Sequence, residues 1–118
     1  MGNEIRKIEE GILYSTFTGD IGLDDVSEFV ENVEPYMQTT TMPLHFVVDA
    51  QHEGRWSLDA RRQFTKMFDK EPRYGKVAIV NASRFTRVAA TFMMKATGRD
   101  DTVRFFDTEA DALIWIKQ

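Results

Sequence analysis

Residues 44–67 read LHFVVDAQHEGRWSLDARRQFTKM, and three patterns follow one another in this stretch. Residues 44–49 are mainly β-branched, aliphatic or aromatic, which is typical of a mostly buried strand. A polar loop with one tryptophan follows, and Ser57 then stands directly before apolar residues spaced three and four apart. A serine at that place is a typical helix N-cap. The stretch therefore predicts a strand, a loop and a helix, with ligands or partners binding beyond the carboxyl end of the strand.

The rest of the chain also alternates between extended and helical patterns. Gly11 separates two extended runs, as in a hairpin, and residues 76–80 form a short apolar run that suits an interior strand of a parallel sheet. Pro35 favours a kink or an end of the first helix near Val33–Glu34. The expected elements are strands at 5–9, 12–18, 44–49, 76–80 and 102–106, and helices that begin near Leu23, after Ser57, after Asn81 or Ser83, and after Thr108.

This order, β-β-α-β-α-β-α-β-α, predicts a single α/β domain over residues 1–118. After the opening hairpin, strands and helices alternate, and short right-handed crossovers then favour a parallel arrangement. We therefore expect a mixed, mostly parallel five-stranded sheet with four helices packed on it.

Charge is unevenly distributed along the chain. Residues 1–60 carry 12 acidic and 3 basic residues, whereas residues 61–118 carry 7 acidic and 12 basic residues, and the net charge is −4. This partition indicates either ordinary charged helix surfaces or two surfaces of opposite sign, one of which meets a charged partner. The basic half is too mixed with acids to indicate nucleic-acid binding. With no cysteine and no apolar run long enough for membrane insertion, the sequence favours a cytoplasmic protein.

Short motifs in the C-terminal part resemble a known family. Residues 96–101 read ATGRDD, and residues 103–113 read VRFFDTEADAL. Together with the order of elements, they resemble the "TG" turn, edge strand and last helix start of the STAS domain, the fold of anti-sigma-factor antagonists of the stage II sporulation protein AA type. Residues 19–21 resemble the glycine turn after that family's second strand. The resemblance implies a divergent STAS-like domain with a regulatory, protein-binding role.

One segment departs from that family's pattern. In the family, the strand end leads to an Asp-Ser-Ser-Gly-Leu-like segment, whose serine at the next helix start is the regulatory phosphorylation site. Here residues 53–59 read EGRWSLD, and Ser57 is the only serine near the equivalent place. The resemblance therefore implies Ser57 as the candidate phosphorylation switch, while its position before the helix indicates an N-cap.

Few side chains suggest catalysis or metal binding. His45 lies within a strand, and His52 and Glu53 share a loop with Asp49 but lack the spacing and the third neutral donor of a metal site. Adjacent carboxylates, as at 24–25, point apart on a helix. The sequence contains no phosphate-binding glycine loop and no nucleophile elbow. We therefore expect no enzyme activity, no cofactor and no metal.

Arginines and aromatic residues near two helix starts suggest a different class of function. Both starts should lie at the carboxyl end of the parallel strands, where exposed amides and guanidinium groups form an anion site. Neighbouring aromatic rings would supply the apolar walls of a ligand site. The residues concerned are Arg55, Trp56, Arg61, Phe64, Arg84, Arg87 and Phe92.

Two functions are open on the sequence alone. The first is a non-enzymatic, regulatory protein-interaction module of the STAS type, switched at Ser57. The second is a binder of a small hydrophobic or lipid-like anion between the second and third helices. A cavity bounded by Trp56, Phe64 and Phe92 would favour the ligand binder, whereas a flat surface with a capped, exposed Ser57 would favour the module. The sequence leaves the oligomeric state open.

Overall fold

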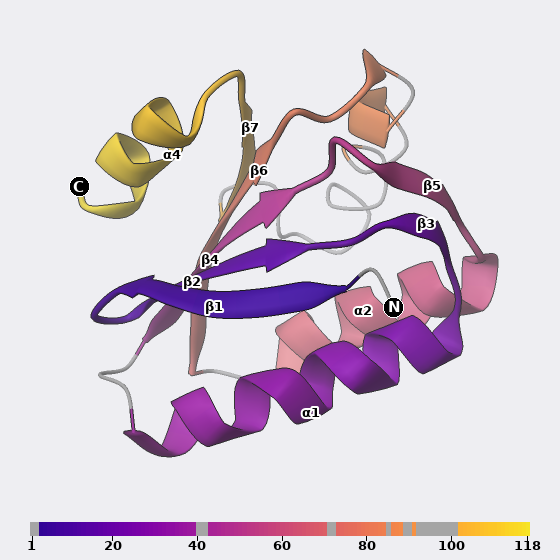
Figure 1. Ribbon diagram of the computed structural model, residues 1–118, viewed down its shortest axis with the longest axis horizontal. Helices are drawn as coiled ribbons and strands as arrows, with labels where there is room; N and C mark the ends of the chain where they lie inside the picture. The colour runs from indigo at the N-terminus through magenta and orange to yellow at the C-terminus, as the bar shows by residue number, and fades with distance from the viewer. Residues whose placement is uncertain (1–2, 40–42, 71–72, 85, 89–90, 92–101) are drawn as a thin grey trace.

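The computed structural model describes residues 3–39, 43–70, 73–84, 86–88, 91 and 102–118. Its strands are β1 (Glu4–Glu9), β2 (Ile12–Thr16), β3 (Gly19–Ile21), β4 (Leu44–Asp49), β5 (Glu53–Trp56), β6 (Tyr74–Val80) and β7 (Val103–Phe106). Within these residues, five strands form one mixed sheet in the order β1-β2-β4-β6-β7 (Figure 1). β1 and β2 are antiparallel, and the other neighbouring pairs are parallel. β3 and β5 form a separate parallel pair.

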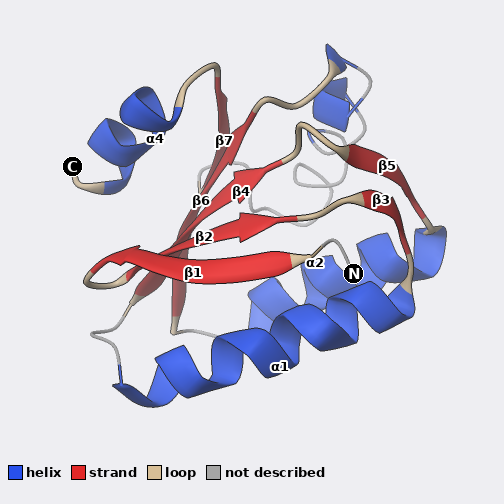
Figure 2. Cartoon of the chain, in the orientation of Figure 1, coloured by secondary structure: helices blue, strands red, loops and turns tan. Residues whose placement is uncertain are grey.

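Helices cover both faces of this sheet. In the described part of the chain they are α1 (Leu23–Thr39), α2 (Leu58–Lys70) and α4 (Glu109–Ile116). The chain steps from β2 to β4 to β6 in one direction across the sheet, so right-handed crossovers place α1 and α2 on the same face. α4 packs on the opposite face, mainly against β6 (Figure 2). This arrangement confirms the predicted α/β class and the mixed, mostly parallel sheet.

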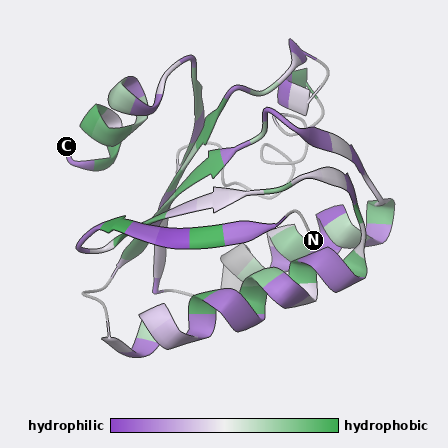
Figure 3. Ribbon diagram, in the orientation of Figure 1, coloured by the Kyte–Doolittle hydropathy of each residue, from purple (hydrophilic) through white to green (hydrophobic). Residues whose placement is uncertain are grey.

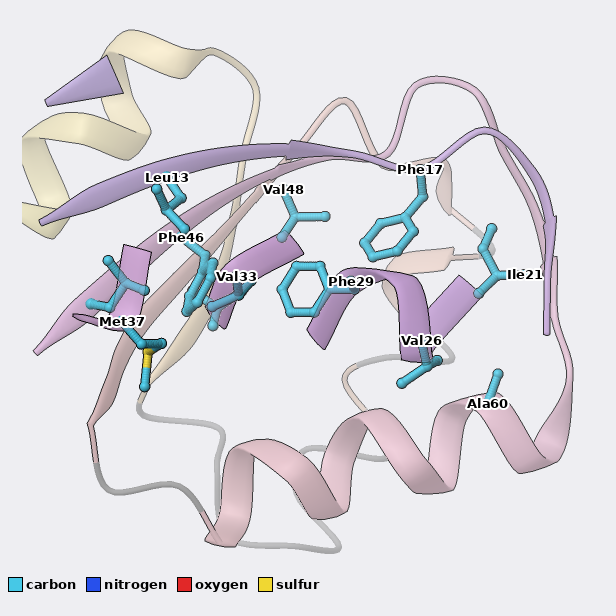
Figure 4. Packing of buried hydrophobic residues seen from close by; sticks show 12 residues of the cluster. Leu13, Phe17, Ile21, Val26, Phe29, Val33, Met37, Phe46, Val48 and Ala60 are labelled. Atoms are coloured by element: carbon cyan, nitrogen blue, oxygen red, sulfur yellow. The ribbon is translucent and has the colours of Figure 1, made fainter. Parts of the chain in front are cut away.

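The main core lies between the sheet and the helices α1 and α2. Phe17, Phe29 and Phe46 are almost completely buried there, and the Phe29 ring lies 5.7 Å from each of the other two ring centroids (Figure 4). A smaller cluster, which includes Val47 and Trp115, fills the space under α4. Because β4 contributes to both clusters, its residues are apolar on both faces, and this explains the nearly continuous apolar run from which the strand was predicted.

Helix starts follow the predicted capping chemistry. At the three helix starts that follow α1, a serine or threonine hydroxyl accepts a backbone N–H three residues further on, as an N-cap does. Ser83 and not Asn81 takes this role before the third helix, where Arg84, 86–88 and 91 are helical and the remaining residues lie outside the described part. The bonds join Ala60 N to Ser57 Oγ (3.0 Å), Thr86 N to Ser83 Oγ (3.1 Å) and Asp111 N to Thr108 Oγ1 (3.2 Å).

A kink or an end of α1 was expected near Val33–Glu34, and the expectation of an end is wrong. The helix continues through Pro35 to Thr39, although a proline inside a helix removes one hydrogen bond and costs about 3 kcal/mol. Pro35 is exposed, so water can satisfy the carbonyl that loses its partner. Met37, two residues further on, is 7% exposed and packs in the main core. Burial of the last turn therefore outweighs the proline.

The segments around Gly19 and Gly54 were expected to be loops, and they instead contain β3 and β5. The second strand correspondingly ends at Thr16, and the chain turns at Gly19, whose φ of +76° favours glycine, before it pairs with the segment after β4. Both strands are short and polar, so they lack the alternating apolar pattern on which the prediction of strands relied.

Lys76 on β6 holds the carboxyl end of α4. Its Nζ lies 2.8 Å from the carbonyl oxygen of Trp115 and 5.1 Å from the centroid of that residue's ring. We predict that Lys76→Met, which keeps the aliphatic stem, lowers the free energy of unfolding by about 1–2 kcal/mol, because it removes charge-assisted hydrogen bonds to the helix end. Urea denaturation measures this loss.

Lys117→Met is the matched control for that measurement. Lys117 forms an ion pair with Glu9 (2.8 Å) in which both side chains are about half exposed. Exposed pairs contribute at most about 1 kcal/mol and usually less. Equal losses in the two variants would contradict a specific role for Lys76.

Candidate functional site

The β3–β5 pair extends the chain beyond the carboxyl ends of β2 and β4. β3 follows β2 and β5 follows β4, and both lead directly into helices on the same face of the sheet (Figure 1). The N–H of Gly19 donates to the carbonyl of His52 (2.9 Å), and the N–H of Ser57 donates to the carbonyl of Ile21 (2.9 Å). Ile21 and Trp56 are register partners. The pair therefore brings the starts of α1 and α2 together.

Asp20 fixes the register of this pair. Its Oδ1 accepts the backbone N–H of Arg55 (2.9 Å), and the same oxygen lies so close to Gly54 that a Cβ there would collide with it. Glycine is favoured at position 54 because a larger residue would displace the Asp20 carboxylate from its bond to Arg55, and not because of an unusual φ.

Trp56 anchors β5 to the main core. Its ring lies edge-on to both Phe17 and Phe64, at 5.2 Å between ring centroids in each case. The indole Nε1 donates to Glu53 Oε1 at 2.8 Å, which satisfies the polar atom of a partly buried tryptophan. Burial raises the pKa of Glu53 from 4.5 to about 7, the charge of Asp49 adds to this effect, and the bond from Trp56 opposes it.

Ser57 caps α2 and remains exposed. Its Oγ accepts the N–H of Ala60, its carbonyl accepts the N–H of Arg61 (3.0 Å), and its side chain faces solvent. Two large apolar side chains at the starts of α1 and α2 are exposed: Leu23 by 49% and Leu58, directly after Ser57, by 57%. Because Ile21 pairs with Trp56, these leucines begin two neighbouring helices at the same level. We refer to Leu23, Ser57 and Leu58 as the Ser57 edge.

A hydrogen-bonded cluster that sequence reasoning missed joins the carboxyl ends of three strands. Asp49 accepts bonds from Tyr14 Oη (2.7 Å), Asn81 Nδ2 (3.2 Å) and the N–H of Gln51 (3.0 Å). Burial would raise the pKa of Asp49, but these three bonds and the charge of His52 together lower it. Burial and the bond to Asp49 raise the pKa of Tyr14. The sequence contained one indication of this cluster: Asp49 and Asn81 each stand at the end of a predicted strand, and the two strands are neighbours.

The arginines of the proposed anion site do not form one cluster in the described structure. Arg55 lies exposed on β5, and Arg61 is half-buried on α2. Arg84 is exposed, whereas Arg87 binds Asp107 after the edge strand β7 (3.1 Å) and lies over the ring of Phe105. Arg87 is therefore occupied on the β7 side of the sheet.

The aromatic residues of that proposed site have different positions. Phe64 packs in the main core against Phe17, Phe29 and Trp56. The rings of Phe64 and Trp56 thus contact one another instead of lining a space between them. Phe92 lies outside the described residues.

Within the described ranges, we find no group of three or more His, Cys, Asp or Glu side chains arranged to hold a metal ion. No helix among the same residues is both long enough and apolar enough to cross a membrane.

A model of the SpoIIAA-like family matches residues 12–117, which is most of the chain. The chain belongs to the SpoIIAA-like family. The resemblance to the STAS domain is thereby confirmed for family and fold. No curated protein matches the sequence.

Solved structures similar to this SpoIIAA-like chain share its fold at low sequence identity. An uncharacterised protein with a SpoIIAA-like fold from Shewanella loihica has a TM-score of 0.70 and 19% identity, over 97% of this chain and 93% of that chain. The anti-sigma factor antagonist SpoIIAA in its unphosphorylated form has a TM-score of 0.62 and 10% identity, over 98% and 97% of the two chains. The Bacillus cell fate determinant SpoIIAA in its phosphorylated form has a TM-score of 0.59 and 10% identity, over 97% and 98%.

Titration of Glu53 in this SpoIIAA-like chain should be visible in stability. Between pH 4.5 and about 7 the folded state keeps the Glu53 proton that the unfolded state releases, so Glu53 lowers stability as the pH rises through this window. We predict that the stability difference between the wild type and Glu53→Gln changes by on the order of 2–3 kcal/mol across it. Urea denaturation of both proteins at a series of pH values measures this change. His45 and His52 are present in both proteins, so their contributions cancel in the difference.

Trp56 emission provides a second readout of the same titration. Ionised Glu53 is a stronger acceptor for the indole N–H, so the emission of the wild type should shift near pH 7 and that of Glu53→Gln should not. Subtracting the emission spectrum of Glu53→Gln from that of the wild type removes the contribution of Trp115. If stability and emission depend on pH in the same way in the wild type and in Glu53→Gln, a raised pKa at Glu53 is refuted.

Proposed function

We propose that this chain is a non-enzymatic, regulatory protein-interaction module of the cytoplasm whose partner binds at the Ser57 edge. The observation that carries the proposal is the pair Leu23 and Leu58, both about half exposed at the starts of adjacent helices, with an exposed, capped serine directly before Leu58. Exposed apolar side chains next to polar groups are the usual composition of a protein-binding patch.

Backbone amides allow the Ser57 edge to bind negatively charged groups of a partner in addition to burying its two leucines against that partner. The first amides of α1 and α2 point out of the same end of the helix layer, and a helix start favours negatively charged groups. In α1 the N–H of Gly22 is already bound by Asp25 Oδ2 (2.8 Å), while in α2 Ser57 binds the N–H of Ala60. A partner would therefore bury the leucines and approach the remaining amides of α2.

The structural neighbours support this class of function. One of them is named an anti-sigma factor antagonist, which is a protein that acts through another protein, and another was solved in a phosphorylated form. At 10% identity these likenesses concern the fold, so a regulatory role for the present chain is our inference. It agrees with the exposed, capped Ser57, which is one of the two features expected for a module.

The leucines can be tested directly. We predict that Leu23→Asp combined with Leu58→Asp abolishes binding of the protein that co-purifies with the wild type, because the variant places two charges in the buried centre of the interface. Calorimetry with the purified partner measures the affinity. Ile114→Asp is the matched control, since Ile114 is 61% exposed on α4, on the opposite face. A double variant that is folded and still binds would exclude the Ser57 edge as the docking site.

Substitutions at Ser57 distinguish a helix cap from a phosphorylation switch. As a cap, Ser57→Ala should cost about 1 kcal/mol of stability, while Ser57→Asp should keep the cap and the fold. Phosphorylation would add about −1.5 to −2 charge at the helix start, where the dipole favours it. We predict that Ser57→Asp remains as stable as the wild type and binds the partner at least about tenfold more weakly, because the new charge must lose water in the interface. An unaltered affinity would leave Ser57 with the role of a cap alone.

A further inference from the structure

The outer sides of α1 and α2 carry opposite charge. α1 contains five acidic residues and no basic residue, and four of the acids are exposed. α2 carries Arg62 and Lys66 on its exposed side, with the half-buried Arg61 beside them, and its only described exposed acid is Asp59 in the first turn. Figure 3 shows hydrophilic residues recurring along α1 between its apolar positions. The exposed acids of α1 are Asp24, Glu28, Glu31 and Glu34.

These charges are not used to join the two helices. Among the described side chains, no ion pair links α1 to α2, and the described ion pairs lie on other elements. Glu31, Arg62 and Lys66 thus have no charged partner in the described part of the protomer. The two neighbouring helices form a face with a negative half and a positive half, which we call the α1–α2 face.

The two halves of this face are level with each other along the helices. Both helices begin at the carboxyl end of the β3–β5 pair and run in the same direction beneath the sheet (Figure 1). Leu23 and Leu58 start at the same level, so residues 35 positions apart remain at similar heights as the helices progress. Glu31 is therefore level with Lys66, and Glu28 is one residue from the level of Arg62.

We propose that the α1–α2 face is a homodimer interface, in which a second copy of this chain binds by a two-fold axis parallel to the helices. Such an axis keeps heights unchanged and exchanges the two halves of the face, so α1 of each copy lies opposite α2 of the other. Glu31 then faces Lys66 of the other copy, and Glu28 faces Arg62, whereas Asp24 faces Asp59 at the end of the face and opposes association. Each contact occurs twice.

A second copy fits this face better than a uniformly charged partner. A basic partner would meet α1 favourably but would oppose Arg62 and Lys66, and an acidic partner would meet the reverse difficulty. The occupant must present both signs, side by side and in exchanged order. The α1–α2 face of another copy presents this arrangement by symmetry.

The size of the face predicts a weak, salt-sensitive dimer. α1 has 17 residues and α2 has 13. At about 1.5 Å per residue and about 10 Å per helix diameter, the two present roughly 400 Å² in projection. Stable interfaces bury about 800 Å² of accessible surface per partner, so this one lies at the small end. We expect dissociation in the micromolar range or above, weakened at least about tenfold between about 50 mM and about 500 mM salt.

Charge exchange between two variants tests the arrangement. In Glu28→Lys/Glu31→Lys the facing positions on both helices are basic, and in Arg62→Glu/Lys66→Glu the facing positions on both are acidic, so each variant alone should remain monomeric at low salt. A mixture of the two should form a heterodimer as tightly as the wild type forms its homodimer, because both helix contacts then join opposite charges. Sedimentation velocity and native mass spectrometry measure the species, and circular dichroism verifies folding.

Two further proteins complete the experiment. The four substitutions in one chain restore opposite charges between copies and within the protomer, so this protein should dimerise even if one of the double variants folds poorly. Glu4→Lys, on the exposed side of β1, changes charge away from the face and should dimerise normally. A wild type that stays monomeric at low salt and high concentration, or double variants that do not associate on mixing, would overturn the proposal.

Discussion

Edge-on packing of Trp56 against Phe17 and Phe64 holds the β3–β5 pair on the main core. Without this contact, two strands of three and four residues would have little to stabilise them, because an isolated pair of strands is marginal in water. Everything at the Ser57 edge depends on that attachment, since the paired strands set the level at which α1 and α2 begin. The pKa of Glu53 is raised for the same reason, because the attachment that orders Trp56 also buries Glu53, and this burial outweighs the hydrogen bond that the indole N–H donates to the carboxylate.

Sequence reasoning predicts the parts of this fold that repeat a local pattern. The apolar runs at 44–49 and 76–80, the Gly11 turn and the caps at Ser57 and Thr108 are each determined by neighbouring residues. β3 and β5 were missed because their pairing depends on contacts 35 residues apart, from Asp20 to Arg55 and from Ile21 to Trp56. The continuation of α1 past Pro35 was missed for a similar reason, since its cause is the burial of Met37 against a core assembled from other elements.

The same distinction applies to the candidate site. Ser57 was recognisable as a cap from its position alone, and the structure confirms that role. The cluster of Tyr14, Asp49 and Asn81 combines side chains from β2, the end of β4 and the end of β6, so only the strand order brings it together. The four arginines were grouped into one anion site because each lies near a helix start. That criterion does not take account of the groups with which each guanidinium forms ion pairs or ring contacts. Arg87 meets Asp107, a residue twenty positions away on the far side of β7.

Strand order also explains why the uneven charge distribution along the sequence produces acidic and basic residues next to each other on one surface. The negative excess of residues 1–60 and the positive excess of residues 61–118 suggested two surfaces of opposite sign. Because successive right-handed crossovers place α1 and α2 next to each other, the acidic residues of α1 and the basic residues of α2 lie on neighbouring helices and not on opposite sides of the molecule. At about 10 Å between helix axes, the two charge rows are separated by about one Debye length at about 0.1 M salt. They therefore act as one dipolar face, which a partner must recognise as a whole.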